Sequence, residues 1–441
     1  MEAKKFVSGF SKMTKEEKIE WISSFYNDTG KLDLNMFEAF WHQDEALQTV
    51  LENFSENTIS NFPMPFGIAP NFHINNKVYA VPMVIEESSV VAAASSAAKF
   101  WMDKGGFNCE VLGTTKIGQL HFKFTGGIDA LYEHFDRIKS TLIESVQALT
   151  ANMRKRGGGV LDIELVDFSA QEENYYQLRV SFETCDSMGA NFINSVLEQF
   201  GLELKAYLSN LYPKQHSEVF MAILSNLTPN CIVRASVSCP VEALDAISPA
   251  FSGIEFAERF RMAVRIAEID PYRATTHNKG IYNGVDSVVL ATGNDFRAVE
   301  ACGHAYAAKD GAYSSLSHCT VEDGTFKFWI DLPIALGTVG GLTKLHPLAN
   351  LALELLGRPS AQELMTIIAS VGLAQNFAAL RSLVTTGIQK GHMKMHLKNI
   401  LTQFSASPSE EIAVNSYFTE RVISHSAVRD FIMDLRAQLE Q

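Results

Sequence analysis

The sequence predicts an α+β fold with three parts. These are a large mixed domain of helices and sheets around a buried helix, an inserted ferredoxin-like βαββαβ small domain, and a helical C-terminal flap. Three observations support this prediction. Strand and helix patterns between residues 117 and 225 follow the βαββαβ order. The run VVAAASSAAKFW has no wide polar face before Lys99, which is typical of a closely surrounded helix. The residue pattern after Gly387 is more polar and predicts helices.

The composition limits the class of protein. A chain of 441 residues is long enough for two or three domains, and 46% hydrophobic with 20% charged residues is typical of a packed globular protein. The net charge of −13 argues against nucleic-acid binding. The six cysteines form no C-x-x-C pair, and the N-terminal residues lack the apolar core of a signal peptide. We therefore expect a cytoplasmic protein with free thiols, no nucleic-acid partner and no membrane partner.

The first predicted element is a helix in which Thr14 caps the N-terminus and Glu17 completes a capping box. Val78–Ile85 is a predicted strand. It leads to Glu86 and Glu87, which we place in the first turn of the helix formed by VVAAASSAAKFW. Carboxylates are common there because the helix dipole favours them.

The inserted small domain is expected at residues 114–226, with the large domain at 1–113 and 227–386 and the flap at 387–441. Its predicted elements are Ile117–Phe124, Asp129–Met153, Val160–Phe168, Tyr175–Glu183, Gly189–Leu211 and Glu218–Leu224. The second helix follows the segment DSMGAN, and free backbone N–H groups at a helix N-terminus can bind phosphate. The sequence contains neither a G-x-G-x-x-G motif after a strand nor a P-loop motif, so the residues alone indicate no Rossmann domain.

In the second half of the large domain, Phe326–Leu332 is a predicted strand, and Leu348–Leu356 and Gln362–Leu383 are predicted helices. The most apolar long window is Leu364–Leu380. Three polar residues interrupt it, so we expect a buried helix and not a membrane span.

The stretch HNKGIYNGVDSVVLATGNDFRAVEACGH, residues 277–304, holds a prominent pair of candidate catalytic residues. We predict a short strand at Ser287–Ala291 between two turns that contain glycine. Such turns would bring Lys279 and Asp295 into one cleft, where a cation and a carboxyl group can serve an oxyanion and a proton transfer. A surface lysine and a turn aspartate explain the same residues without any function.

His392 and His396 lie four residues apart in the C-terminal part and can share a helix face. A zinc protease would require H-E-x-x-H, and no glutamate stands between these histidines, so no metal site is predicted. Two histidines on a partly exposed helix are one interpretation. The glycine before His392 also suits a hinged flap that carries a proton donor.

Four motifs, NKGIYNG, ATGNDFRAVEACGHAYAA, DSMGAN and GIQKGHM, resemble those of the class II hydroxymethylglutaryl-coenzyme A (HMG-CoA) reductases. The resemblance extends from Phe10 to beyond His396. It implies an enzyme that reduces the thioester of HMG-CoA to mevalonate and free CoA by two hydride transfers from NAD(P)H. The alternatives are mevalonate oxidation with NAD and a non-catalytic protein that binds acyl-CoA or a nucleotide. An unrelated metal hydrolase would require bound metal.

The resemblance also implies roles for individual residues. The catalytic residues would be Lys279 as the oxyanion partner, Glu87 as the proton donor, Asp295 as the group that holds both, and His392 as the acid for the CoA thiolate. The residues at the acyl group would be Ser89, Arg273 and Asn283. The cofactor-binding residues would be Asp186, Met188, Gly189, Asn191, Asn226 and Gln375. Ser60 and Ser88 depart from the family's motifs, which have glycine and proline there.

The segment at the end of the first small-domain helix bears on the choice of cofactor. Family members that prefer NADH can carry an acidic residue there, which accepts the ribose hydroxyl and repels a 2′-phosphate. Here the aligned residue is Thr150, and the cations Arg154, Lys155 and Arg156 follow. We predict that they favour NADPH over NADH by pairing with the 2′-phosphate. A basic helix C-terminus that answers its dipole is the alternative interpretation. The family also implies a homodimer or a higher even oligomer, with the cleft between subunits.

Overall fold

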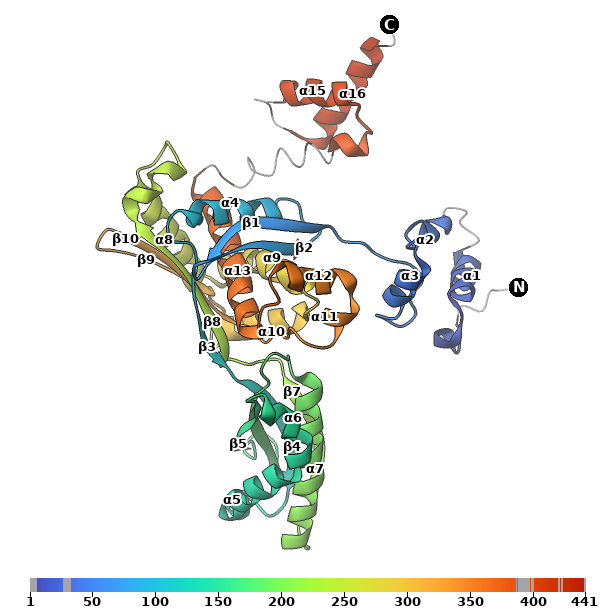
Figure 1. Ribbon diagram of the computed structural model, residues 1–441, viewed down its shortest axis with the longest axis vertical. Helices are drawn as coiled ribbons and strands as arrows, with labels where there is room; N and C mark the ends of the chain where they lie inside the picture. Colours follow the sequence, from blue (N-terminus) through green and yellow to red (C-terminus); the bar gives the residue numbers. More distant parts are fainter. Residues whose placement is uncertain are drawn as a thin grey trace.

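The computed structural model describes residues 6–26, 33–385, 387, 397, 400–418, 421 and 423–439. A central body carries two sheets and is flanked by a smaller unit below it in the view of Figure 1. Helices near the N-terminus lie to one side of the body, and helices near the C-terminus lie above it.

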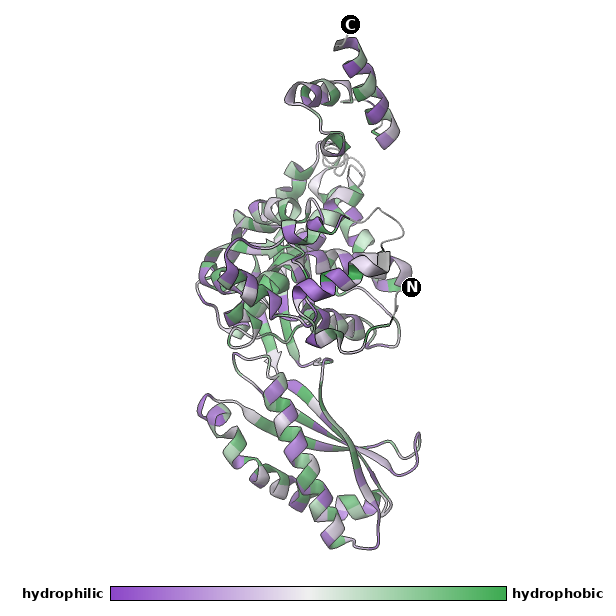
Figure 2. Cartoon of the chain, turned by 90° about the vertical axis from the view of Figure 1, so that its right-hand side faces the viewer, coloured by the Kyte–Doolittle hydropathy of each residue, from purple (hydrophilic) through white to green (hydrophobic). Residues whose placement is uncertain are grey.

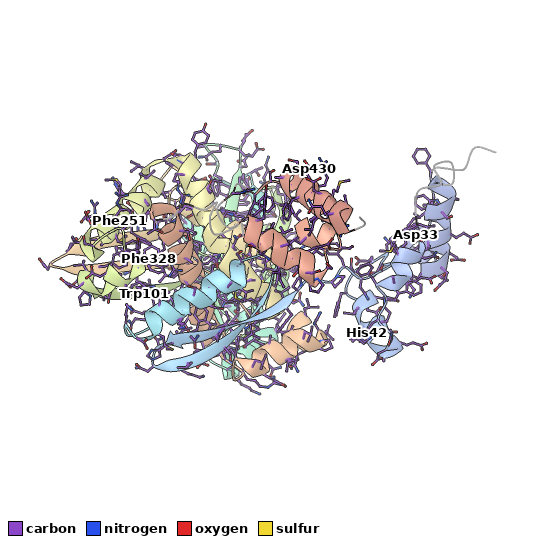
Figure 3. The ribbon with its side chains drawn as sticks, turned by 90° about the horizontal axis from the view of Figure 1, so that it is seen from above. Asp33, His42, Trp101, Phe251, Phe328 and Asp430 are labelled. Carbon is purple, nitrogen blue, oxygen red and sulfur yellow. The ribbon has the colours of Figure 1, made fainter. Side chains whose placement is uncertain are left out.

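The centre of the body is helix α13 (Ala361–Val384), whose residues are buried along most of its length. It packs against an antiparallel sheet in the order β3 (Asn108–Thr114), β8 (Cys231–Pro240), β10 (Thr325–Pro333) and β9 (Ser317–Glu322). Trp101 and Phe328 are fully buried in this core (Figure 3). By length and composition α13 could span a membrane, but 72% of its apolar window is buried, so the prediction of a core helix is confirmed.

The other elements of the body surround α13 or cover the ends of the sheet. They are the antiparallel pair β1 (Phe66–Ile74) and β2 (Lys77–Val84), and the helices α4 (Val90–Met102), η2 (Val241–Ile247), α8 (Gly253–Ile269), α9 (Pro271–Ala291), α10 (Phe296–Ala307), α11 (Leu342–Leu345) and α12 (Pro347–Leu355). Among them, α9 makes the most extensive contact with α13. Helix α9 is therefore the element through which the core determines the position of the candidate site.

The smaller unit consists of β4 (Lys116–Phe124), α5 (Ile128–Ser145), α6 (Gln147–Lys155), β5 (Gly159–Asp167), β6 (Tyr175–Glu183), α7 (Ala190–Leu211) and β7 (Ser217–Ser225). Its strands pair antiparallel in the order β5-β6-β4-β7, which is the ferredoxin-like arrangement that the sequence predicts. The unit has its own apolar core. Its helices alternate between hydrophobic and hydrophilic residues around their surface (Figure 2), as expected for helices that cover one face of a sheet. The proposed domain limits at residues 114 and 226 stay a prediction.

The terminal segments are helical. Near the N-terminus lie η1 (Phe10–Lys12), α1 (Lys15–Tyr26), α2 (Asn35–Ala39) and α3 (Glu45–Glu52). The capping box before α1 is confirmed, because Thr14 N–H donates to Glu17 Oε2 and Glu17 N–H donates to Thr14 Oγ1. Near the C-terminus, α15 (Pro408–Tyr417) and α16 (His425–Leu439) enclose a small core of their own.

The predicted strand at Ser287–Ala291 is wrong, because these residues form the last turns of α9. The valines of this run favour a strand only weakly, and burial against α13 overrides that preference. A Cβ on Gly284 would lie 2.7 Å from the carbonyl oxygen of Val371. The glycine that resembled a turn signal instead allows α9 and α13 to approach each other closely.

Two further expectations need correction. Helix α4 is not surrounded on all sides, because it buries a face that includes Ala94 and Trp101 and leaves Lys99 exposed. The closely surrounded helix of the body is α13. The single helix expected at Asp129–Met153 is divided at Val146 into α5 and α6.

Candidate active site

The side chain of Lys279 meets Glu87 at the surface of the body. Lys279 Nζ lies 2.6 Å from Glu87 Oε2, and the side-chain amide of Asn283 donates to the same oxygen at 3.3 Å. Lys279 and Asn283 lie one turn apart on α9, whereas Glu87 comes from the segment between β2 and α4. Both charged side chains are accessible, 61% for Lys279 and 38% for Glu87. The structure therefore presents a cation, a carboxyl group and an amide to one ligand.

Asn278, the residue before Lys279, anchors this part of α9. Its side chain is fully buried, its amide nitrogen donates to the carbonyl oxygen of Ser314 at 2.9 Å, and its oxygen accepts from the N–H of Leu316 at 3.1 Å. A buried amide with these partners cannot rotate away without leaving polar groups unsatisfied. The anchor on one side of α9 therefore directs Lys279 outward.

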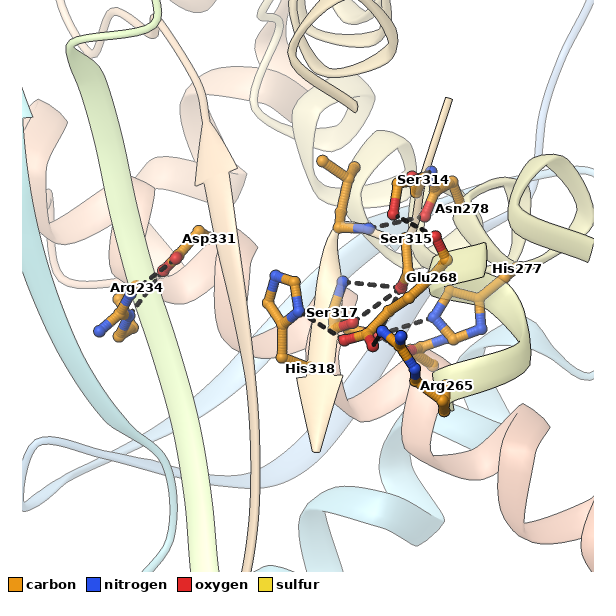
Figure 4. A network of polar contacts seen from close by, with 12 residues as sticks. Arg234, Arg265, Glu268, His277, Asn278, Ser314, Ser315, Ser317, His318 and Asp331 are labelled. Carbon is orange, nitrogen blue, oxygen red and sulfur yellow. Dashed lines mark hydrogen bonds and ion pairs between the residues drawn. The ribbon is translucent and has the colours of Figure 1, made fainter. Parts of the chain in front are cut away.

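His277 forms a second anchor, shown with the first in Figure 4. Its Nε2 lies 2.6 Å from Ser317 Oγ, and that hydroxyl donates to Asn376 Oδ1 on α13. We therefore assign the proton of the ring to Nε2. Burial, and after it the nearby Arg273 and His318, lowers the pKa of His277 to about 3. A histidine that stays neutral in this way holds α9 in place and is not a proton donor.

Two of the predicted acyl-group residues lie at helix starts. Ser89 is the N-cap of α4 with φ = 74°, and its side chain caps no backbone N–H. A left-handed conformation at a residue other than glycine stores strain and is frequent at functional sites. Glu87 precedes this N-cap, so its predicted place in the first turn of the helix is corrected. Arg273 lies in the first turn of α9, burial lowers its pKa, and no ion pair to it occurs among the described residues.

The family resemblance implied that Asp295 holds Lys279 and Glu87, but among the described residues no hydrogen bond or ion pair joins Asp295 to either of them. It is the N-cap of α10 and accepts hydrogen bonds from the N–H groups of Arg297 and Ala298. It also pairs with the Arg297 guanidinium at 3.2 Å. Burial opposes its ionisation, but the hydrogen bonds from Arg297 and Ala298 hold the pKa of Asp295 below its ordinary value. Within one chain, Asp295 is therefore an ionised carboxylate turned toward its own helix.

A cavity of about 480 Å³ lies between the small unit and the body. The small unit contributes Met188, Gly189, Asn191 and Arg156 to its lining, and the body contributes Asp295 and the glycine-rich segment 337–343. Asp295 thus lines the same cavity as three of the predicted cofactor residues. The catalytic candidates Lys279 and Glu87 and the acyl-group candidate Asn283 are not part of that lining.

The start of helix α7 suits the phosphate groups of a dinucleotide. Gly189 is its N-cap with φ = 90°, and no side chain caps the first turn. The first N–H groups of a long helix therefore stay available at the cavity, where the helix dipole favours an anion. A Cβ at Gly189 would lie 2.4 Å from Thr184 Cγ2, so a larger residue cannot take this place without a shift.

The other predicted cofactor residues occupy different places. Asp186 accepts a hydrogen bond from Ala361 N–H at the start of α13, and so links the small unit to the body. Asn226 lines a narrow crevice together with Met188 and the buried Lys116. Gln375 is buried on α13, and its Oε1 has no hydrogen-bond partner within the described part of the chain. Neither Asp186 nor Gln375 is part of the cavity lining, and Gln375 instead lies against Gly284 of α9.

The three consecutive cations differ in their surroundings. The guanidinium of Arg154 donates to the carbonyl oxygen of Gln147 at 2.8 Å, on its own helix. Lys155 is exposed, and Arg156 is the cation of this run that lines the cavity. His392 and His396 lie outside the described residues, so their predicted roles stay predictions. The described residues contain no group of three or more His, Cys, Asp or Glu that could hold a metal ion.

A half-buried carboxyl pair joins α9 to α10, and no feature singled out in the sequence predicted it. Asp286 approaches Glu300 of α10, and burial, followed by the charge and hydrogen bond of Glu300, raises the pKa of Asp286 to about 8. Asp286 Oδ1 and the nearby Tyr282 hydroxyl are buried and have no hydrogen-bond partner among the described residues. Asp286 follows Asn283 by three residues and Lys279 by seven, and helical spacing would have placed all three on one face. This helical spacing was overlooked because the segment was predicted to be a strand.

This pair predicts how stability depends on pH. In the folded protein Asp286 keeps its proton up to about pH 8, whereas the unfolded chain loses it near pH 4. Its contribution to stability is fully present below pH 4 and is lost as the pH rises toward 8. Asp286→Asn donates to Glu300 without a titrating proton. We expect its melting temperature to exceed that of the wild type increasingly from pH 5 to pH 8, with a free-energy slope of at most about 1.4 kcal/mol per pH unit.

Thermal unfolding at several pH values would measure this slope. The matched control is Glu258→Gln, which changes an exposed carboxylate in an ordinary ion pair with Arg261. Its difference from the wild type should not vary with pH in this range. A constant difference for Asp286→Asn across the range would contradict the assignment.

The fold and the site define a class of protein. The body carries an ion pair of lysine and glutamate beside an amide. A separate cavity next to the ferredoxin-like unit suits a dinucleotide. Together these features define an oxidoreductase that acts on a carbonyl group without a Rossmann domain. The family model of hydroxymethylglutaryl-coenzyme A reductase matches residues 15–397. The chain belongs to this family, as its motifs predicted.

Relatives and solved structures agree with this assignment. The chain is 36% identical to the 3-hydroxy-3-methylglutaryl-coenzyme A reductase of Archaeoglobus fulgidus over 92% of its own length and 88% of the relative's. It is 32% identical to a probable reductase of Borreliella burgdorferi, over 90% and 87%. A structure of the Streptococcus pneumoniae reductase aligns with a TM-score of 0.71 at 35% identity, and covers 97% of this chain and all of that one. A class II structure from the same organism, bound to NADPH, aligns with a TM-score of 0.70 at 36% identity over 86% of this chain and all of that one.

Proposed function

We propose that this chain reduces the thioester of HMG-CoA to mevalonate and free CoA in two successive hydride transfers, and that Lys279, Glu87 and Asn283 form the reacting centre. The observation that supports this most directly is the ion pair of Lys279 and Glu87 at 2.6 Å, with the amide of Asn283 at the same carboxylate oxygen. Members of this family are oxidoreductases that use a nicotinamide cofactor. When bound, the cofactor supplies the hydride.

The residues of the chain provide charge and protons around the carbonyl carbon. The ammonium of Lys279 stabilises the negative charge that develops on the carbonyl oxygen. Glu87 accepts a hydrogen bond from that ammonium, which holds its carboxyl group beside the same oxygen. The protonated carboxylic acid form of Glu87 is the form that delivers a proton to this oxygen, and the transfer leaves the carboxylate that pairs with Lys279. Asn283 orients the Glu87 carboxyl group. The hemithioacetal formed by the first transfer then releases CoA as a thiolate, and we assign the acid for that step to His392.

The acyl group is assigned to the start of α9 and the start of α4. Arg273 is a partly buried cation with no ion pair among the described residues, and a free carboxylate on the acyl chain would supply its partner. Ser89 contributes a hydroxyl that caps no backbone group. These two residues orient the acyl chain, while Lys279 and Glu87 act on its thioester end.

The cofactor is assigned to the cavity beside α7, with NADPH preferred over NADH. Met188, Gly189 and Asn191 line this cavity with the uncapped helix start, and Arg156 lies at its edge. We also assign Asp186, Asn226 and Gln375 to cofactor binding, and Arg154 and Lys155 add positive charge nearby. A 2′-phosphate carries two negative charges near neutral pH, and a guanidinium binds it in a charge-assisted contact.

The ratio of kcat/KM for NADPH over that for NADH tests this preference. We expect a ratio above one for the wild type, and a decrease of about tenfold or more in Arg156→Ala, the scale of one hydrogen bond to a charged group. Arg154→Ala and Lys155→Ala are matched single-charge controls and should change the ratio less, because Arg154 is held by Gln147 and Lys155 does not line the cavity. A wild-type ratio below one would overturn the NADPH preference. A high ratio unaffected by all three substitutions would remove these cations as its cause.

We further propose a homodimer, or a higher even oligomer, in which one subunit's cavity faces the other subunit's acyl site. Within one chain, Asp295 lines the cofactor cavity and pairs with Arg297, and it does not contact Lys279. A second copy in a two-fold arrangement can bring its Asp295 and its cofactor to Lys279 and Glu87. No nucleic acid or membrane takes part in this proposal, and we place the enzyme in the cytoplasm.

A further inference from the structure

We propose that Gly280 is the floor of the acyl site, where the branched acyl chain of the substrate lies directly against the backbone of α9. This inference rests on the proposed roles of Lys279, Glu87 and Arg273. It assigns a specificity-determining position to a residue that carries no side chain.

The position of Gly280 on α9 places it next to Lys279 and, along the helix, between Arg273 and Asn283. Residues of an α-helix are about 100° apart around its axis. Gly280 follows Arg273 by seven residues, so it projects within about 20° of the same direction, two turns further along. It projects about 60° from Asn283 and about 100° from Lys279. Its bare Cα therefore lies on the helix surface bounded by these three side chains.

Nothing in the part of the fold that the structure describes requires glycine at this position. No heavy atom that the structure describes lies within 4 Å of a Cβ built on Gly280, apart from those of its chain neighbours and of the backbone of its own helix. Gly280 has no positive φ, so the backbone conformation suits any residue. Glycine in a helix interior also lowers stability relative to alanine.

Other glycines of the helix pair behave differently. A Cβ on Gly284 would lie 2.7 Å from Val371 O, and a Cβ on Gly372 would lie 2.8 Å from Val285 Cγ2. These glycines allow α9 and α13 to pack. Gly280 instead leaves open space beside a cation and an ion pair, which is where a ligand would approach the backbone.

The chemistry of the proposed substrate fits this surface. Its acyl chain has a free carboxylate at one end, a thioester at the other and a branched carbon between them. The carboxylate matches the guanidinium of Arg273, and the thioester carbonyl matches Lys279 with Glu87. The branched carbon then lies over Gly280, where even one methyl group on the protein would occupy its space.

The experiment compares Gly280→Ala with Gly284→Ala, two equal changes one turn apart in the same helix. For Gly280→Ala we expect an unchanged or higher melting temperature and an unchanged affinity for NADPH alone. We also expect the KM for HMG-CoA to rise, and the affinity for mevalonate measured by calorimetry to fall, each about tenfold or more. For Gly284→Ala we expect a lower melting temperature, because its Cβ meets the backbone of α13.

The possible results distinguish the proposed role of Gly280 from the proposed reductase function. Wild-type KM and wild-type mevalonate affinity in Gly280→Ala would overturn the acyl floor while the proposed function stands. A melting temperature that falls as far in Gly280→Ala as in Gly284→Ala would also overturn it, because Gly280 would then be a packing glycine. Wild-type protein that reduces no HMG-CoA would overturn the proposed function itself.

Discussion

Replacing Lys279 by alanine should lower the turnover of HMG-CoA reduction by about a hundredfold or more, which is the usual loss when one oxyanion donor is removed. The reason is that the ammonium acts on charge that develops only in the transition state. The KM for HMG-CoA should change less, because Arg273 and Ser89, to which we assign the acyl chain, are unchanged. Steady-state kinetics that follow the absorbance of the reduced cofactor would measure both quantities.

The same substitution should leave the fold intact. Lys279 and Glu87 form an ion pair in which both side chains are more than a third exposed, and such pairs add little to stability. The melting temperature of Lys279→Ala should therefore stay close to that of the wild type. Lys309→Ala is a matched control, because Lys309 lies beyond the end of α10 over the ring of Tyr306 and outside the site. Turnover retained in Lys279→Ala would remove this residue from the reacting centre.

Two inactive variants should restore activity when they are combined in one dimer. Lys279→Ala and Asp295→Asn each damage every site of a homodimer. If Lys279 of one subunit works with Asp295 of the other, a heterodimer of the two variants has one intact site. We expect purified heterodimers, selected by two different affinity tags, to recover about half of the wild-type turnover. Asparagine is also a good N-cap, so Asp295→Asn should preserve the start of α10.

The control combines Lys279→Ala with Glu87→Gln. Lys279 and Glu87 contact each other within one chain, so this heterodimer has no intact site and should stay inactive. Recovery in this control, or none in the combination of Lys279→Ala with Asp295→Asn, would disprove the shared site. Sedimentation at the assay concentration would show whether the protein is a dimer, and full activity with the mass of a single chain would exclude the proposal.

The sequence predicted the elements whose signals are local. β6 was predicted with its bounds, because alternating residues and a polar loop define Tyr175–Glu183. The box formed by Thr14 and Glu17 was predicted because its partners lie three residues apart. Helix α9 was missed because it depends on contact with α13, which comes much later in the chain. Gly284 and Gln375, which meet in this contact, are 91 positions apart (375 − 284). The contact with a distant helix decides such a segment, and a short window of sequence does not contain it.

For the candidate site too, the sequence predicted some features and the structure was needed for others. Motifs identified Glu87, Lys279 and Asn283 as residues of one site, and the structure brings their side chains together. The motifs did not indicate that Asp295 turns to Arg297 within its own chain, or that Arg156 rather than Arg154 lines the cavity. Both facts depend on side-chain directions in three dimensions, which residue order alone does not specify.

By itself, the sequence determined the family, the ferredoxin-like unit and the residue types at the reacting centre, because motifs and periodicity are carried by neighbouring residues. Only the tertiary structure decided that α9 is one continuous helix, that Asn278 and His277 anchor it, and that Gly280 and Gly284 serve opposite purposes four residues apart. The physical reason is that burial and close approach are properties of two surfaces in contact. Identical glycines differ only in what lies opposite them, and the fold alone brings that partner into place.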